Sequence, residues 1–361
     1  MSVSESLRDS QTELLRAALD QRVIPSLDGL RALAVSTVMI YHAGYQWMPG
    51  GQGVTLFFVL SGFLITWLLL REDRETGTVS LRKFYVRRSL RIFPAFYTYW
   101  LAIVGLLFVT GRDIQWGHVW SSFLYVGNYW IAAQLPENSS LSHTWSLAIE
   151  EQFYLLFPGL FLLIRADLRR LAVVLAMIVG TVWINRIVRV SVGDSMSYLY
   201  HATDTRMDHL LIGCIMAIAV SRGIPEWGNR FLSRSAHAAT IAALAVSLTA
   251  SYQSPMAYRM TVGFALEPVL LGIIVLQSIV LQPALLQARP VVYTGRISYG
   301  MYLYQQVTIP TGQKLMPGSN DLLDLIAGVI LTIGMAELSF RLVEQRFLRL
   351  KKHWSVELAQ Q

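Results

Sequence analysis

An arginine and a histidine share one apolar stretch near the start of the chain, at Arg31 and His42. Ionisable side chains at membrane depth are costly, so each is a candidate functional residue. The eleven positions between them correspond to about 16 Å along a helix and to nearly three turns, so both side chains point roughly the same way. We predict a fixed cation at one membrane face and, on the same helix, the only histidine deep within a span. A neutral imidazole there can accept a proton from a hydroxyl group.

Two adjacent carboxylates, Glu150 and Glu151, are candidate partners for this imidazole. A carboxylate beside a catalytic histidine orients the ring and stabilises the imidazolium that forms. Successive helical positions are turned by about 100°, so only one of the two can face inward. We favour Glu150, because Ser146 and Tyr154 lie four residues to either side of it and would extend one polar face.

Two further arginines, Arg88 and Arg91, lie one helical turn apart just before an apolar stretch. Guanidinium groups bind phosphate in a planar, bidentate way, so this pair is a candidate phosphate-binding site. Arg31 could contribute to that site from the adjoining helix. The alternative is that these arginines only set the membrane topology, because segment 71–91 contains seven basic residues.

A second group of ionisable residues is predicted near the outer membrane face. Arg186 and Arg189 end the fifth apolar stretch, where they either snorkel to the interface or line a polar cavity that meets the substrate. Other ionisable residues expected at the same depth are Glu150, Glu151, Asp204, Arg206, Asp208, His209 and Glu267. Together they predict a water-filled vestibule that opens to the outside, with Arg186, Arg206 and Asp208 as substrate contacts.

The composition is typical of a membrane protein. The chain of 361 residues is 54% hydrophobic and only 15% charged, whereas soluble proteins carry about 25% charged residues. We predict an all-α, polytopic transmembrane bundle whose ten spans correspond to the apolar stretches 31–48, 54–70, 92–110, 143–164, 171–190, 206–222, 236–252, 259–281, 297–315 and 321–343. The lipid bilayer is thus an expected partner. The net charge of +7 is assigned to topology-setting loops and not to nucleic-acid binding.

The positive-inside rule assigns the basic segment 71–91 to the cytoplasmic side. Ten spans then place the later basic clusters on that side as well, whereas an eleventh span would move them outside. We therefore expect 119–135 to be a re-entrant or peripheral segment on the outer side. Residues 1–24 and 351–361 become cytoplasmic ends of an integral membrane domain that covers 25–350.

Several short motifs follow one another along the chain. They are residues 27–34 followed by His42, residues 53–65, the Arg-x-x-Arg segment 84–94, residues 143–154, and the shorter 205–208, 295–299 and 340–344. In this order they resemble the motifs of the membrane-bound acyltransferase 3 family, from Ile24 to Leu348. Relatives often carry a histidine after the late Ser-Tyr-x-x-Tyr-Leu run, where this chain has Tyr304, Gln305 and Gln306. This departure removes one candidate base and leaves more of the proton transfer to His42.

The resemblance implies transfer of an acyl group, commonly acetyl, from cytoplasmic acyl-CoA to an extracytoplasmic hydroxyl group, most often on a cell-surface carbohydrate. The roles it implies are proton transfer by His42, Glu150 and Glu151, and donor binding by Arg31, Arg88, Arg91 and Ser61. Ser61 lies among small and aromatic residues, a pattern that favours close helix packing, and contact of Ser61 with the thioester is the alternative. The expected location is the bacterial inner membrane. The seven histidines are scattered without ligand spacing, so no metal is expected.

Two alternatives stay open at this point. The acceptor could be a secreted small molecule or a lipid instead of a carbohydrate. A different class of function is a proton-coupled transporter or flippase, in which Arg31 and His42 form a proton relay. Transporters often show paired, interrupted spans in corresponding halves, and no such symmetry is visible in this sequence. Binding of acyl-CoA to the purified protein would distinguish the enzyme from the transporter.

Overall fold

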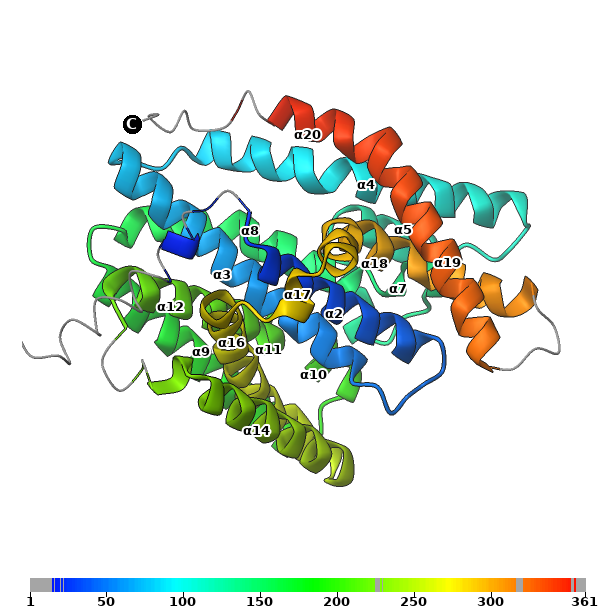
Figure 1. Ribbon diagram of the computed structural model, residues 1–361. Helices are drawn as coiled ribbons and strands as arrows, with labels where there is room; N and C mark the ends of the chain where they lie inside the picture. The colour runs from blue at the N-terminus through cyan, green and yellow to red at the C-terminus, as the bar shows by residue number, and fades with distance from the viewer. Residues whose placement is uncertain are drawn as a thin grey trace, which may run out of the picture.

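The computed structural model describes residues 23–224, 230–315 and 321–351, together with residues 15, 17–19, 21, 228 and 354. Every regular element in this part of the chain is a helix (Figure 1). The longer helices are α2 (Pro25–His42), α3 (Gly50–Thr76), α4 (Leu81–Val109), α8 (Trp145–Ile164), α9 (Leu168–Ser191), α12 (Asp208–Arg222), α14 (Arg234–Gln253), α16 (Phe264–Leu281), α18 (Arg289–Leu315) and α19 (Asp321–Ser339). The all-α fold expected from the sequence is confirmed.

Shorter elements join or extend the long helices. The short α-helices are α5 (Trp116–Phe123), α6 (Gly127–Ala132), α7 (Ser139–Ser142), α10 (Met196–His201), α11 (Thr203–Arg206), α15 (Met256–Tyr258), α17 (Ala284–Gln287) and α20 (Gln345–Lys351). Arg230–Leu232 forms a 3₁₀ turn (η1), while Arg259–Gly263 (η2) and Phe340–Glu344 (η3) are single π-helical turns. The π turns make α16 and α19 parts of longer helical segments.

Six helical segments are long and apolar enough to cross a bilayer, judged by length and composition. They are Gly50–Thr76, Leu81–Val109, Ser139–Ile164, Leu168–Ser191, Met256–Leu281 and Asp321–Lys351. Each of the ten predicted apolar stretches overlaps one long helix, but the other four helices do not reach the same limits of length and hydropathy. The polytopic helical bundle is thus confirmed, and the count of ten spans stays a prediction.

Helix α3 lies at the centre of the bundle. In its most apolar window 78% of the residues are buried, against 22% for the last of the six segments. It packs against α2, α12 and α16. The contact with α12 depends on two glycines, because a Cβ atom at Gly62 would clash with the carbonyl oxygen of Leu210, and one at Gly213 with that of Val59. The close helix packing predicted for the 53–65 motif is therefore confirmed.

Helix α18 brings the late part of the chain against its beginning. It packs on α2 and α19, and α20 then lies across α4 (Figure 1). Gly295 permits the crossing of α18 and α2, because a Cβ atom there would overlap the backbone of Asp28. The first turns of α2, α4 and α18 and the last turns of α3 and α20 lie together on one side of the bundle.

Helix α2 ends earlier than the apolar stretch 31–48 predicts. Its last residue is His42, and Gly44 then adopts a φ of 105°, a conformation that favours glycine. His42 is exposed at this helix end. The prediction that this helix continues to residue 48 is therefore wrong, because the chain turns immediately after His42, whereas the depth of the imidazole in a membrane stays a prediction.

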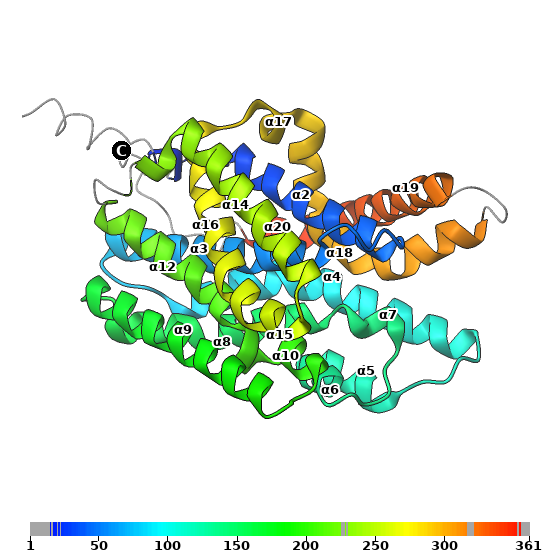
Figure 2. The same cartoon turned by 90° about the horizontal axis from the view of Figure 1, so that it is seen from below.

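Residues 119–135 contain no helix that could cross a membrane. They fall on α5 and α6, which are eight and six residues long, whereas a span needs about 20 residues. Helix α6 lies against α5, α8 and α10 (Figure 2). The segment therefore agrees with the expectation of a re-entrant or peripheral element.

Candidate active site

Glu72 holds the basic segment at the start of α4 in place. Its carboxylate accepts a hydrogen bond from the backbone nitrogen of Ser80 at 2.9 Å and forms an ion pair with Arg87 at 2.7 Å. The Ser80 hydroxyl is also the N-cap of α4, where it accepts from a backbone N–H of the first turn. These contacts join the end of α3 to the start of α4, so the face of α4 that carries Arg88 and Arg91 has a defined position.

A cavity of about 560 Å³ opens beside this segment, and we call it the arginine cleft. Its lining comes from α2, α3, α4, α18 and the end of α20. The basic side chains in the lining are Arg31, Arg71, Arg87, Arg88, Arg91, Arg296 and Lys351. The structure therefore brings together the three arginines predicted from the sequence and adds Arg296 from α18 and Lys351 from α20.

The arginines of the cleft differ in their partners. Arg31 and Arg87 are paired with neighbouring carboxylates at 2.9 and 2.7 Å. Arg88 lies 4.7 Å from the centre of the Tyr154 ring. Neither Arg88 nor Arg91 forms an ion pair with any residue that the structure describes. Their guanidinium groups are the ones best placed to bind an anionic ligand.

A second cavity, of about 120 Å³, continues from the cleft into the bundle, and we call it the narrow cavity. The residues that line both are Arg31, Ser61, Arg88 and Arg91. Ser146 and Tyr302 line only the narrow cavity. Their hydroxyl groups are 2.6 Å apart, and the Tyr302 hydroxyl donates to the carbonyl oxygen of His143 at 2.9 Å. The hollow thus runs from a wide basic mouth to a small polar end.

Glu150 and Glu151 have different surroundings. Glu150 lines the narrow cavity and accepts a hydrogen bond from the Ser61 hydroxyl at 2.8 Å. Glu151 lines neither cavity, and its Oε1 is buried without a hydrogen-bond partner in the described part of the chain. This agrees with the prediction that only one of them faces inward. The predicted pairing of Glu150 with His42 is not formed, because Glu150 faces the arginines while His42 ends α2.

His143 is a buried histidine that the sequence analysis missed. Only 4% of its surface is exposed, and its ring lies 5.6 Å from the Tyr99 ring and 5.4 Å from the Tyr302 ring, measured between centres. The expectation that His42 is the only deep histidine is therefore wrong. The available signal was that His143 is the first residue of the fourth motif.

Arg186 and Asp208, two of the predicted substrate contacts, bind each other instead. Both side chains are 0% exposed. The Nη1 and Nη2 atoms of Arg186 donate to the two carboxylate oxygens at 3.1 and 2.8 Å, and Trp183 Nε1 donates to the same carboxylate at 2.9 Å. In this structure the pair joins α9 to α12 and is closed to a ligand.

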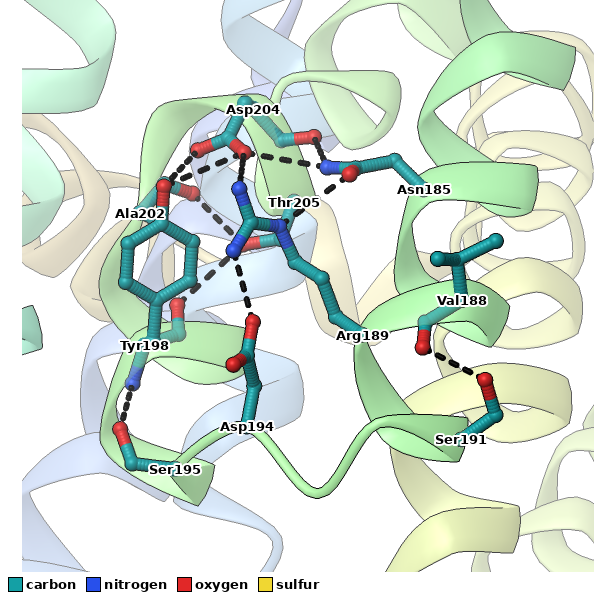
Figure 3. A network of polar contacts seen from close by, with 10 residues as sticks. All are labelled: Asn185, Val188, Arg189, Ser191, Asp194, Ser195, Tyr198, Ala202, Asp204 and Thr205. Carbon is teal, nitrogen blue, oxygen red and sulfur yellow. Dashed lines mark hydrogen bonds and ion pairs between the residues drawn. The ribbon is translucent and has the colours of Figure 1, made fainter.

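Arg189 forms a separate network at the end of α9 (Figure 3). It lies 2.7 Å from Asp194 and 3.3 Å from Asp204, and its guanidinium is 4.2 Å from the centre of the Tyr198 ring. This partly exposed arginine therefore ties the end of α9 to the loop and short helices that follow it.

Arg206, the third predicted substrate contact, is enclosed by aromatic rings. It is 0% exposed and lies 4.1 Å from the centre of the Phe264 ring and 4.9 Å from that of Tyr200. None of its side-chain nitrogens has a hydrogen-bond partner among the described residues. The predicted water-filled vestibule is not formed around this group, because rings and ion pairs fill the space. No cluster of three or more metal-binding side chains occurs within the described ranges.

Comparison with known proteins decides the family. Residues 24–338 match the family model Acyl_transf_3, described as an acyltransferase domain. The chain belongs to the acyltransferase 3 family. No solved structure matches this acyltransferase 3 protein.

Curated relatives of this acyltransferase 3 protein include bacterial O-acetyltransferases. It is 32% identical over 354 residues to the peptidoglycan O-acetyltransferase OatA of Listeria monocytogenes, with 90% of this chain and 56% of the relative covered. It is 34% identical over 352 residues to the putative peptidoglycan O-acetyltransferase YrhL of Bacillus subtilis, with 90% and 55% covered. It is 32% identical over 350 residues to the O-acetyltransferase OatA of Staphylococcus aureus, with 90% and 57% covered. The chain thus spans just over half the length of these relatives.

Proposed function

We propose that this protein transfers an acyl group, acetyl in the first instance, from acyl-CoA to a hydroxyl group of a cell-surface carbohydrate. The observation that carries the proposal is the arginine cleft, which narrows into a cavity lined by Ser61, Glu150 and Tyr302. The cleft volume of about 560 Å³ lies within the range of about 300–1,000 Å³ that is typical of small-molecule sites. The relatives that are named peptidoglycan O-acetyltransferases support the acceptor class.

The proposed donor has its charge at one end and its reactive group at the other. Coenzyme A carries a pyrophosphate and a 3′-phosphate, which would bind Arg88 and Arg91, because guanidinium forks pair with phosphate oxygens. Arg31 borders both cavities and would guide the slender arm of the coenzyme inward. The thioester would then lie near Ser61 and Tyr302 in the narrow cavity of about 120 Å³, which admits the arm but not the nucleotide.

His42 is the proposed general base, since it is exposed at the end of α2 and accessible to a hydroxyl group. The acceptor oxygen attacks the thioester carbonyl, so an ester C–O bond forms and the C–S bond breaks. The hydroxyl proton passes to His42 and then to the leaving thiolate. Because Arg31 lies in the cleft and His42 ends the same helix, α2 separates the donor phosphates from the base by about 16 Å.

We assign the arginine cleft to the cytoplasmic side of the bacterial inner membrane, where basic loops accumulate. The integral membrane domain would then be residues 25–350, and 1–24 and 351–361 would be cytoplasmic. Reporter fusions at both termini and within 111–142 test this orientation. The expected result is cytoplasmic termini and an external 111–142, and an external C-terminus would overturn it.

Binding of acetyl-CoA to the purified full chain tests the donor half of the proposal. Calorimetry should detect binding by the wild type. Arg88→Ala should weaken it by about tenfold or more, because a hydrogen bond to a charged group contributes about 1.5–3 kcal/mol. Arg169→Ala is the matched control, since it removes the same charge from an exposed residue outside the cleft and should leave the affinity unchanged. Absence of binding by the wild type would refute the enzyme and favour the transporter.

Mass spectrometry of surface glycans, with and without the gene, tests the acceptor half. The expected result is the loss of an acetyl mass increment from the glycan when the gene is absent. If the increment disappears instead from a secreted small molecule or a lipid, the acceptor is of that class and the carbohydrate assignment is wrong.

A further inference from the structure

The narrow cavity has a direction that helix α3 defines. The later turns of α3, up to Glu75, line the arginine cleft, and Ser61 lines both hollows. Toward the start of the helix the lining continues with Phe58, Phe57 and Val54, which border the narrow cavity alone. Ser61 and Val54 are seven positions apart, which corresponds to about 10 Å along the helix. Val54 therefore lies at the end of the cavity that is farthest from its basic mouth.

Helices α8 and α18 follow the cavity in the same way. Tyr154 of α8 lies beside Arg88 of the mouth, with its ring centre 4.7 Å from the guanidinium, whereas the first turn of α8 lines the other end. Arg296 of α18 lines the arginine cleft, and Tyr302, nearly two turns further along, lines the narrow cavity. We call the side chains farthest from the mouth the end wall, and they are Val54, Ser146, Leu147 and Tyr302.

The polar half of the end wall is held by hydrogen bonds. The hydroxyl groups of Ser146 and Tyr302 are 2.6 Å apart, and that of Tyr302 donates to the carbonyl oxygen of His143 at 2.9 Å. The Phe57 ring meets the Tyr302 ring edge to face, with 6.2 Å between their centres. Moving Tyr302 aside would break these contacts and leave buried polar groups unpaired, which is costly. This half of the wall therefore stays in place when a ligand enters.

The other half of the end wall is aliphatic. Val54 and Leu147 are each 7% exposed and belong to the main hydrophobic core. The space beside them is filled by Phe58, which lies 6.1 Å from the Trp145 ring and 5.8 Å from the Arg206 guanidinium, measured from its ring centre. Closely packed interiors yield little to an added methylene group. The methyl groups of Val54 and Leu147 therefore set how far an apolar group can extend into the cavity.

We propose that Val54 and Leu147 select the donor by the length of its acyl chain and admit acetyl in preference to longer chains. This inference rests on the proposed acyl transfer and deepens it. With the phosphates of the coenzyme at Arg88 and Arg91, the acyl group is the part of the donor that reaches the end wall. One extra methylene in an apolar pocket changes discrimination by about 10–200-fold. The bonds that form and break in the transfer are the same for every chain length.

Binding of two acyl-CoA donors to the purified full chain tests this inference without an acceptor. Calorimetry gives the Kd for acetyl-CoA and for butyryl-CoA, and the ratio of the butyryl Kd to the acetyl Kd measures the selection. In the wild type this ratio should be about ten or more. Val54→Ala and Leu147→Ala remove carbon atoms from the end wall and should lower the ratio by about tenfold. Val54→Ile adds one carbon atom and should raise the ratio above that of the wild type.

Val59→Ala and Leu175→Ala are the matched controls, since they make the same two deletions elsewhere. Both residues are 0% exposed, and neither lines the arginine cleft or the narrow cavity. They should lower the melting temperature, as core deletions do, and leave the Kd ratio within about twofold of the wild-type ratio. If Val54→Ala or Leu147→Ala does not fold, the opposite effect expected for Val54→Ile still decides the question, because that variant leaves no void.

The outcomes separate this inference from the proposed function. If the wild type binds acetyl-CoA and butyryl-CoA with Kd values within about twofold of each other, the selection is refuted and the acyl-CoA site stands. If the wild type discriminates but the end-wall variants change the ratio no more than Val59→Ala and Leu175→Ala do, selection lies elsewhere and the inference is again refuted. If the wild type binds neither donor, the proposed function fails first and the inference fails with it.

Discussion

The ion pair between Arg186 and Asp208 should contribute to stability and not to substrate binding. The Asp208 carboxylate accepts two hydrogen bonds from Arg186 and one from Trp183, at 2.8 to 3.1 Å. Asp208→Asn would replace one acceptor oxygen by a donor that faces other donors. It would leave the Arg186 charge without a counter-charge, and its hydrogen-bond acceptors would be the one remaining amide oxygen and the Thr205 carbonyl oxygen, at 2.9 Å.

The expected cost of Asp208→Asn follows from this geometry. Both partners are 0% exposed, and removing one partner of a buried pair costs about 3–5 kcal/mol, because the other charge stays buried and uncompensated. That is a large share of the roughly 5–15 kcal/mol by which proteins are stable. Replacing both residues by apolar ones, as Arg186→Met with Asp208→Leu, should recover most of the loss, because no charge is then left behind.

Unfolding of the purified protein in detergent, followed by circular dichroism, measures these changes. A double-mutant cycle should give a coupling energy of about 3 kcal/mol or more between the two positions. The acceptor KM of Asp208→Asn should stay near that of the wild type in the fraction that is folded. If instead stability stays within about 0.5 kcal/mol of the wild type and the acceptor KM rises, the pair binds substrate and the structural reasoning is wrong.

Three further predictions concern other polar groups. His42→Ala should reduce kcat by about 10²–10⁴-fold without changing the Kd for acetyl-CoA, and retention of more than about a tenth of the activity would exclude it as the base. Glu150→Gln should lower the transfer rate by about tenfold or more, because Glu150 borders the narrow cavity. The transfer rate of Glu151→Gln should stay within about twofold of the wild-type rate. Equal rates for the two variants would contradict this difference. Burial lowers the pKa of His118 from 6.5 to about 4, so the unfolded chain binds more protons between these values and stability should fall by about 3 kcal/mol as the pH drops through that window. Melting temperatures at pH 7 and pH 4.5 should show that His118→Phe weakens this acid sensitivity, and an unchanged pH dependence would refute the assignment.

Features that depend on one element could be predicted from the chain alone. The composition and the apolar stretches indicate the helical membrane bundle, because hydropathy and length decide whether a segment can be a span. The one-turn spacing of Arg88 and Arg91 places them on one face of α4, and the structure shows both lining one cleft. The contrast between Glu150 and Glu151 follows in the same way, because helical geometry turns successive residues by about 100° and adjacent side chains therefore face different directions.

Contacts between elements required the tertiary structure. Sequence reasoning expected Arg186, Arg206 and Asp208 at one depth, but depth says nothing of which charges pair or which rings enclose them. Likewise the contact between the His143 and Tyr302 rings depends on how α18 packs against the segment before α8, and the close approach of Gly295 to Asp28 sets part of the position of α18. The spacing of residues along a helix is fixed by local backbone geometry, whereas the partner of a buried polar group is decided by the packing of whole helices against one another.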